Sequence, residues 1–430
     1  MSSAQATRSA FEPLRAIRYD SSQVALADVV APPYDVISPD QRRLMAAREP
    51  HSSVRLILPD SPGSAADLMH AWIREGVLVR DPAPAVWWHS QRFTGPDGRD
   101  HTRSGFLSAV RLSPYDEGRV RPHEQTHASA KADRLALIRA VHANLSPVFG
   151  LYDDPSGAAA ALAPTAGAPA EMEATDDDGT VHRFWRVGDA SLIAALQTAL
   201  KGSEILIADG HHRYETALAY RAEQRKRDGD PGGDRPYDFM LMHLVELADP
   251  GLVVYPTHRV VLGTREVTPD LLTAFAVREL TGTPSQVEAG LHRIGDDRVG
   301  FAVWRGTGRP ALLAELRDRS AAVLAMPGSP AALRTVDSAV LEALVLAPML
   351  GLLDREQFLT TDRVRYVREL QAATAAVDAG DAGAAFLLRA PTVEQVRAVA
   401  AAGRVMPQKS TYFFPKLHSG FLFNPLDDGA

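Results

Sequence analysis

Residues 205–218 read Ile205-Leu206-Ile207-Ala208-Asp209-Gly210-His211-His212-Arg213-Tyr214-Glu215-Thr216-Ala217-Leu218, and the fold that we expect follows from this stretch. The apolar run at its start predicts a buried strand. The pair Asp209-Gly210 is typical of a turn, because glycine accepts backbone angles that other residues resist. From His211 onward, apolar residues recur at helical spacing. The stretch therefore predicts a strand that passes through a tight turn into a helix.

Two histidines and an arginine stand where this helix begins. The first N–H groups of a helix lack partners within it, and the helix dipole favours negative charge there. We therefore predict a site for a phosphate or a carboxylate, built from Gly210, His211, His212 and Arg213. The acidic Asp209 stands beside it. The alternative is that Asp209 only caps the helix and that both histidines are surface residues.

The composition is that of an ordinary globular protein. The 430 residues are 45% hydrophobic and 23% charged, and the net charge of −7 argues against a broad nucleic-acid surface. No apolar run is long enough for a membrane span, and the polar N-terminus lacks a secretory pattern. The absence of cysteine excludes disulfides, thiolate metal sites and cysteine nucleophiles. We expect a cytoplasmic protein of two or three domains.

The order of predicted strands and helices indicates an α+β or mixed α/β fold. We divide the chain into an N-terminal α/β region at 1–153, a linker or insertion at 154–180, a core with the anion-binding turn at 181–265, and a C-terminal α/β region at 266–430. The linker prediction rests on the many Ala, Pro, Gly and Asp residues of that segment.

Four local patterns carry specific expectations. Residues 54–58 predict a strand, and residues 268–280 predict a helix. Strands at 239–246 and 252–255 are expected to pair around a turn. An apolar helix at 336–346 should stop at the proline just beyond it, because proline cannot donate a backbone hydrogen bond.

The string His123-Glu124-x-x-His127 matches a zinc-protease pattern. There, two histidines one helical turn apart bind the metal and the glutamate activates its water. A proline directly precedes the string, its neighbours are polar and no third ligand follows, so we disfavour a protease. The string is either a polar loop before a helix or, with Lys131 and Arg134, part of the site at the histidine turn.

Three further polar clusters are candidates for site residues or for structural corners. They are Tyr34 and Asp35 in a rigid Pro-Pro loop, His258 and Arg259 after a Pro-Thr pair, and Lys409, Ser410 and Thr411 near the C-terminus. The last cluster offers a cation and two hydroxyls, which are groups that phosphate-binding loops use, although the chain has no Walker pattern.

Several motifs occur in order along nearly the whole chain. They are Phe11-Glu12-Pro13, Ala31-Pro32-Pro33-Tyr34-Asp35, His123-Glu124 with Asp133-Arg134-Leu135, Ala208 to Tyr214, and Met406-Pro407 with Lys409-Ser410-Thr411. Together they resemble the bacterial and archaeal family called domain of unknown function 1015. The resemblance implies that His123-Glu124 belongs to the pattern of that family, which further disfavours the protease.

A second, local resemblance concerns Asp209 to Arg213. The string Asp-Gly-His-His-Arg is similar to one in the free serine kinases of the ParB/sulfiredoxin-like superfamily. This resemblance implies a ParB/sulfiredoxin-like core around 204–222, phosphates bound at the turn, and phosphoryl transfer from a nucleotide to the hydroxyl of free serine. The sulfiredoxin branch has its reactive cysteine where His211 stands, so that chemistry is absent here. The acidic net charge argues against the DNA binding of the ParB branch.

We therefore expect a phosphotransferase that moves a phosphoryl group between a nucleotide and a small hydroxyl compound, with a serine-like amino acid as first choice. The expected catalytic residues are Asp209, Glu124, His211 and His212, with Asp209 also as the metal ligand. The expected phosphate- or nucleotide-binding residues are Gly210, His211, His212, Arg213, Lys131, Arg134, Lys409, Ser410 and Thr411. The expected substrate-binding residues are Tyr34, Asp35, His123, His258 and Arg259.

The cofactors implied by the resemblance are Mg²⁺ and a nucleotide, ATP or ADP. The expected partners are a small-molecule substrate and that nucleotide, with no nucleic acid and no membrane, and a homodimer is left open. Two alternatives remain. One is a phosphatase acting on a small phosphorylated metabolite such as phosphoserine, and the other is a nucleotide-binding or sensing module without catalysis.

Overall fold

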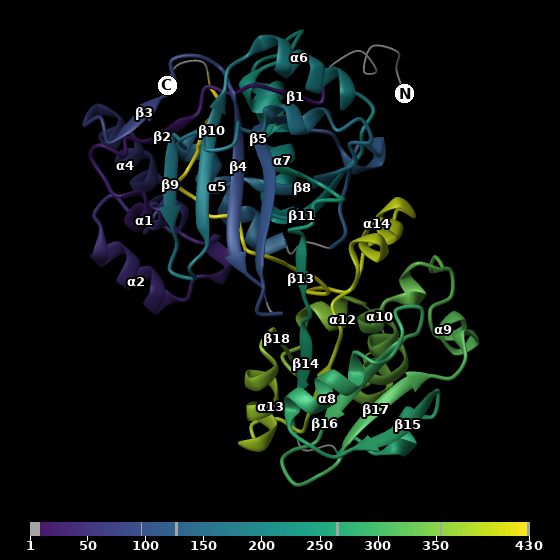
Figure 1. Ribbon diagram of the computed structural model, residues 1–430. Coiled ribbons are helices and arrows are strands. Elements are labelled where there is room, and N and C mark those ends of the chain that lie inside the picture. The colour runs from purple at the N-terminus through teal and green to yellow at the C-terminus, as the bar shows by residue number, and fades with distance from the viewer. Residues whose placement is uncertain (1–8, 96, 125–127, 264–265, 353–354, 428–430) are drawn as a thin grey trace. The chain divides into compact units, whose positions relative to one another are not determined.

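The computed structural model describes residues 9–95, 97–124, 128–263, 266–352 and 355–427 (Figure 1). The chain forms two compact units. The first unit contains Met1–Pro122, Thr126–Val253 and Pro415–Ala430, and the second contains His123–Gln125 and Val254–Phe414. The C-terminal segment, yellow in Figure 1, is thus part of the first unit.

A nine-stranded mixed sheet forms the centre of the first unit. The strand order is β6-β11-β8-β12-β5-β4-β10-β9, and β1 pairs with β5 off this path. Strand β11 runs parallel to β6, and β12 runs parallel to β8, whereas the other pairs are antiparallel. The bounds are β1 (Phe11–Glu12), β4 (Val86–Thr94), β5 (Asp100–Arg111), β6 (Val120–Arg121), β8 (Val148–Tyr152), β9 (Met172–Thr175), β10 (Val181–Val187), β11 (Ile205–Asp209) and β12 (Phe239–Glu246).

Both faces of this sheet are buried. Side chains alternate along a strand, so Leu107 and Ala109 of β5 enter one core while Phe106 and Val110 enter the other. The first core also takes residues from α1, α3, α4 and α5, and the second takes residues from α6 and α7. The helices are α1 (Leu26–Val29), α2 (Pro39–Arg48), α3 (Val54–Ile57), α4 (Pro62–Arg74), α5 (Ala128–Val141), α6 (Ala190–Ala199) and α7 (His211–Arg227). Two short strand pairs, β2 (Ile17–Tyr19) with β3 (Leu78–Arg80) and β7 (Ala143–Asn144) with β21 (Asn424–Pro425), complete the unit.

An antiparallel six-stranded sheet forms the centre of the second unit, in the order β15-β17-β16-β19-β14-β18. Its strands are β14 (His258–Val261), β15 (Phe275–Leu280), β16 (Gly300–Trp304), β17 (Ala311–Leu316), β18 (Val364–Val367) and β19 (Ala384–Leu387). A separate pair joins β13 (Val253–Tyr255) to β20 (Tyr412–Phe414). The helices are α8 (Pro284–Leu291), α9 (Arg319–Ala325), α10 (Asp337–Leu341), α11 (Ala347–Leu350), α12 (Arg355–Thr360), α13 (Leu370–Asp378) and α14 (Val393–Ala401).

The mixed α/β class predicted from the sequence is confirmed, but two local predictions are wrong. Residues 54–57 form the helical turn α3 and not a strand, because a short apolar run does not distinguish the two and tertiary packing decides. Within 268–280, only Pro269–Leu272 is helical, as a 3-10 turn, and the rest contains β15. Strand β15 is an edge strand whose partner, β17, lies far along the chain.

Two more expectations fail for reasons of geometry. Strand β13 does not pair with β12, because β12 already has β8 on one side and β5 on the other. The helix that begins at Asp337 does not stop at Pro348, but passes through a π turn at Glu342–Leu346 and continues to Leu350. After the π turn, Pro348 stands in the first turn of a new α segment, where its missing N–H costs little.

The segment 154–180, for which we expected a linker or an insertion, contributes to the large sheet. It contains a 3-10 turn at Ala158–Leu162 and strand β9, which pairs with β10. The side chains of Leu162 and Met172 are buried. This part of the chain therefore remains within the first unit.

Candidate functional site

The predicted strand, turn and helix are present at the expected residues. Strand β11 ends at Asp209, and helix α7 begins at His211. The pairing of β11 with β8 shifts register between Ile207 and Asp209. Such a shift re-aims the side chain at the end of a strand. The junction brings the side chain of Asp209 against that of Arg213, one helical turn later.

Gly210 makes this arrangement possible. Its φ angle is +94°, in a region that favours glycine. A Cβ atom at this position would lie 3.0–3.1 Å from three atoms of the Arg213 guanidinium group. The Arg213 side chain therefore folds back over the turn, into the space that a larger residue would take.

Asp209 has both carboxylate oxygens engaged by cations. Its Oδ2 accepts a hydrogen bond from Arg213 Nη2 at 2.7 Å, and its Oδ1 accepts one from Lys416 Nζ. Burial alone would raise the pKa of Asp209, but Lys416, Arg213 and His211 outweigh that effect and lower the pKa to about 2. Asp209 is therefore an ionised anchor for two cationic side chains at neutral pH.

Arg213 and Arg134 line one cavity of about 60 Å³ in the first unit, and Tyr34 lies on the same wall. The Arg134 guanidinium lies over the Tyr34 ring, 4.4 Å from its centroid, and donates to the Ile57 carbonyl at 2.6 Å. Arg213 donates to the Pro147 carbonyl as well as to Asp209. The two guanidinium groups are thus held in place, and their side chains are only 12% and 9% exposed.

The same cavity has a buried hydroxyl that has no partner among the residues that the structure describes. Thr216, one turn beyond Arg213 on α7, lines the cavity, and its Oγ1 makes no hydrogen bond to any described residue. A buried polar group without a partner costs free energy, which a bound polar ligand would recover. Apolar side chains also line the cavity, among them Leu137, Ile138 and Met240. Two arginines, a threonine hydroxyl and several apolar side chains therefore line one cavity, and each arginine is paired with an aspartate, Arg134 with Asp133 and Arg213 with Asp209.

The other predicted residues of the first unit are not among the residues that line this cavity. His211 is 7% exposed, and its charge acts on Asp209, whereas His212 is half-buried. Lys131 forms an ion pair with Glu215 at 2.8 Å, which joins α5 to α7. Asp35 is exposed in the short 3-10 turn that follows the two prolines.

The other predicted residues belong to the second unit, and several of them contact one another. His123 is fully buried, and its Nε2 lies 2.7 Å from Thr411 Oγ1. Glu124 follows it, with a carboxylate oxygen 4.0 Å from the His123 ring. Ser410 donates to the Pro407 carbonyl at 2.7 Å and contacts Ser338 at 3.0 Å. His127 lies outside the described residues, so the zinc-protease pattern is only partly described.

Arg259 organises the loop that carries Lys409. Its buried guanidinium donates to the carbonyls of Gln408 and Lys409 and lies 4.7 Å from the centroid of the Tyr366 ring. Its neighbour His258 accepts a hydrogen bond from the Leu388 N–H at 3.1 Å. These contacts tie both side chains to backbone groups of the second unit, and their predicted role in substrate binding stays a prediction.

Sequence reasoning missed three residues of the first unit's site. Lys416 and Thr216 were not singled out, and neither was Arg103, whose buried side chain donates to the Pro415 carbonyl at 2.6 Å. The charge of Asp209 acts on Arg103. Lys416 lies five residues after the motif that ends at Thr411, and that nearness was the available signal. Its partner cannot be read from the sequence, because Asp209 is 207 residues away.

Across the described parts of the chain, none of the helices has both the length and the apolar character needed to cross a membrane.

Comparison with known proteins gives one extensive match. Residues 11–332 match the model of a family described as "Protein of unknown function (DUF1015)". No curated protein matches the chain.

Solved structures similar to this chain include a conserved hypothetical protein from Pyrococcus furiosus, with 15% identity, a TM-score of 0.33 and coverage of 71% of this chain and 91% of that one. A free serine kinase in complex with AMP has 15% identity, a TM-score of 0.35 and coverage of 71% and 89%. SbnI with a C-terminal truncation from Staphylococcus aureus has 10% identity, a TM-score of 0.34 and coverage of 74% and 87%. At these TM-scores the likenesses carry no argument about function.

Proposed function

The chain belongs to the family described as "Protein of unknown function (DUF1015)", as its motifs predicted, and on that premise we propose that its first unit is a phosphotransferase. It moves a phosphoryl group between a nucleotide, ATP or ADP, and the hydroxyl of a small compound. A serine-like amino acid is the first choice of acceptor.

The observation that carries this proposal is that two buried arginines, Arg134 and Arg213, are among the residues that line one cavity. Guanidinium groups match the geometry of phosphate oxygens and bind them through two parallel hydrogen bonds. Phosphoryl transfer needs mainly positioning and neutralisation of charge, and fixed arginines supply both. The neighbouring N-terminus of α7 adds to the positive potential.

The cavity fits a phosphate group better than a whole nucleotide. Its volume of about 60 Å³ has room for a few water molecules or one small anion. The hydroxyl of Thr216 would donate to a phosphate oxygen, and the apolar wall would keep water away from it. The base and ribose of a nucleotide would therefore lie outside this cavity, with only a phosphate inside.

Asp209 acts in this proposal as the residue that positions Arg213 and Lys416. A general base works best with a pKa near the working pH, and the low pKa of Asp209 makes it a weak base. Arg213 and Lys416 also surround its carboxylate with positive charge, which does not fit a divalent cation. We therefore assign no step to Mg²⁺ at Asp209. Glu124 stays a predicted base in the second unit.

The serine-like acceptor rests on the local resemblance of Asp209 to Arg213 to the free serine kinases. The proposed ParB/sulfiredoxin-like core around 204–222 rests on the same string. In such a site, His211 and His212 would bind the donor phosphates beside Arg213. Because of this resemblance, free serine is the acceptor to be tested first.

The test is to incubate the protein with ATP or ADP, with and without serine and Mg²⁺, and to follow the phosphorus species by ³¹P NMR. Formation of phosphoserine supports the kinase. Consumption of added phosphoserine would instead assign a phosphatase, and nucleotide binding without turnover would assign a binding module.

Two variants connect the result to the cavity. We expect Arg134→Met and Arg213→Met each to weaken phosphate or nucleotide binding roughly 10- to 100-fold, the effect of losing a charge-assisted hydrogen bond. The matched control is Arg139→Met, because Arg139 is on the same helix as Arg134 but pairs with Glu223 on the surface. The proposal is wrong if both cavity variants bind and react like the control.

A further inference from the structure

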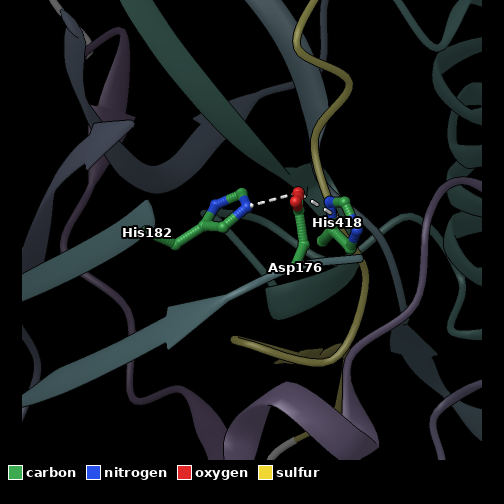
Figure 2. Close-up of side chains that lie close together, drawn as sticks. All are labelled: Asp176, His182 and His418. Carbon is green, nitrogen blue, oxygen red and sulfur yellow. Dashed lines mark hydrogen bonds and ion pairs between the residues drawn. The ribbon is translucent and has the colours of Figure 1, made fainter. Parts of the chain in front are cut away.

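A second group of polar side chains lies in the first unit and plays no part in the proposed reaction. Asp176 follows β9, His182 is the second residue of β10, and His418 comes from the C-terminal segment (Figure 2). Each offers one ligand atom, and these atoms lie within 4.8 Å of one another. Figure 2 shows both imidazole rings beside the Asp176 carboxylate. The side chains of Asp176, His182 and His418 are 3%, 0% and 8% exposed.

The carboxylate of Asp176 is oriented by the turn that contains it. Its Oδ1 accepts hydrogen bonds from the backbone N–H groups of Asp178 at 3.0 Å and Thr180 at 2.8 Å. Its Oδ2 is left facing the imidazoles, 3.0 Å from His182 Nε2 and 3.6 Å from His418 Nε2. A carboxylate fixed in this way presents one oxygen to whatever lies between the two rings.

His182 is oriented from its other side. Its Nδ1 lies 3.3 Å from Nε2 of His89, which itself stacks on Phe184 with 4.0 Å between ring centroids. Histidines that bind a metal commonly hold their second ring nitrogen in a hydrogen bond of this kind, which fixes the tautomer and the ring plane. In the tautomer in which His182 Nδ1–H donates to His89, Nε2 carries no proton and is the nitrogen that could bind a metal.

The position of His418 distinguishes a metal site from a simple hydrogen-bonded His–Asp pair. His182 alone would account for the Asp176 oxygen, by donating its Nε2–H. The 3.6 Å approach of His418 is too long for a good hydrogen bond. A second imidazole placed at the same oxygen has no hydrogen-bonding purpose there, but it completes a set of metal ligands.

We propose that Asp176, His182 and His418 bind one divalent metal ion, with Zn²⁺ as the ion that fits best. Two imidazole nitrogens and one carboxylate oxygen are typical zinc ligands, and tetrahedral coordination places such atoms about 3.3 Å apart. The two distances from Asp176 Oδ2, 3.0 and 3.6 Å, lie on either side of that value, and all three ligand atoms lie within 4.8 Å of one another. Three protein ligands leave a fourth position for water or an outside group.

Such an ion would attach the C-terminal segment to the β9–β10 hairpin. His418 lies two residues after Lys416, which contacts Asp209. Binding a metal in the folded state stabilises that state, because the three ligands are not assembled in the unfolded chain. The ion would therefore help to hold the segment that supplies Lys416. The metal site itself does not depend on the proposed phosphotransferase activity.

The test uses the full-length protein, stripped with a chelator and then titrated with Co²⁺ or Zn²⁺ alone. We expect one equivalent of Co²⁺ to produce the visible absorption of a tetrahedral site, and Zn²⁺ to displace it. Native mass spectrometry should show one bound Zn²⁺, and Zn²⁺ should raise the thermal unfolding midpoint.

His418→Gln is the decisive variant, because it leaves the His182–Asp176 hydrogen bond in place. We expect it to bind Co²⁺ at least about 100-fold more weakly, since even the loss of an outer partner costs about 10- to 100-fold. The matched control is His101→Gln, which removes a half-buried histidine paired with Asp97 in the same unit. Failure of the stripped wild-type protein to bind Zn²⁺, or unchanged Co²⁺ binding by folded His418→Gln, would overturn the proposal.

Discussion

At the scale of single residues, His258 illustrates a buried imidazole that is held neutral. Burial, reinforced by the charge of Arg259 and opposed by Glu369, lowers the pKa of His258 to about 4. Its Nδ1 accepts a hydrogen bond from the Leu388 N–H, which requires an unprotonated nitrogen. His258 is the first residue of β14 and is buried there, and its predicted role in substrate binding stays a prediction.

The lowered pKa of His258 predicts a pH-dependent stability. The unfolded state has the ordinary pKa of about 6.5, so it takes up a proton between pH 6.5 and 4 that the folded state does not. Stability is therefore complete above about pH 6.5, falls as the pH falls towards 4, and levels off below. The contribution of this residue is roughly 3 kcal/mol at most. We expect His258→Asn, whose oxygen can still accept from Leu388, to lose less stability than the wild type between pH 7 and pH 4.5.

Urea unfolding at the two pH values measures this difference. His292→Asn is the control, because His292 is exposed. An equal loss of stability with acid in the wild type and in His258→Asn would contradict the assignment.

At the scale of elements, the junction of β11 and α7 depends on one glycine. Gly210 has a positive φ angle, and the Arg213 guanidinium occupies the space where a side chain would begin. Both the Asp209–Arg213 ion pair and the place of Arg213 in the cavity lining therefore require that residue 210 has no side chain.

Gly210→Ala should disturb both stability and anion binding. We expect a loss of roughly 1–2 kcal/mol from the left-handed backbone, together with a displaced Arg213 side chain. Urea unfolding and calorimetric titration with inorganic phosphate measure the two effects. Gly202→Ala is the control. Gly202 precedes β11, its φ angle is not in the left-handed region, and an added Cβ atom would meet no other atom within 4 Å. Phosphate binding that is equal in both variants would show that Arg213 does not depend on the turn.

At the scale of the whole molecule, the C-terminal segment completes the core of the first unit. Phe423 is fully buried and exchanges two backbone hydrogen bonds with Ile17, at 2.9 and 2.8 Å. Phe421 packs against Phe184, with 4.6 Å between their ring centroids. Strand β21 pairs with β7 in the same segment. The last part of the chain is therefore needed for the large sheet to be covered.

Phe423→Ala should destabilise the first unit by about 3–5 kcal/mol, because it leaves a cavity in a packed core. Hydrogen exchange of the β4, β5 and β12 amides measures this effect. Leu324→Ala is the control, because Leu324 is 82% exposed and its truncation should change stability by less than about 0.5 kcal/mol. Unchanged exchange in Phe423→Ala would mean that the segment is not part of the cooperative core.

Local patterns predicted the elements whose stability depends on near neighbours in sequence. The passage from β11 to α7 is present where the sequence placed it. Strand β15 and helical turn α3 were misassigned, because their form depends on partners that lie elsewhere in the chain. Strand β13 was given the wrong partner for the same reason.

The sequence by itself determined the family, the mixed α/β class and the turn at Gly210, because each rests on residues that are adjacent or on motifs read in order. Only the tertiary structure decided that Lys416 contacts Asp209, that Arg134 shares a cavity with Arg213, and that His418 approaches Asp176. These contacts join segments far apart in the chain. Side-chain spacing along the sequence specifies local geometry, whereas sheet order and the return of the C-terminal segment bring distant charges together.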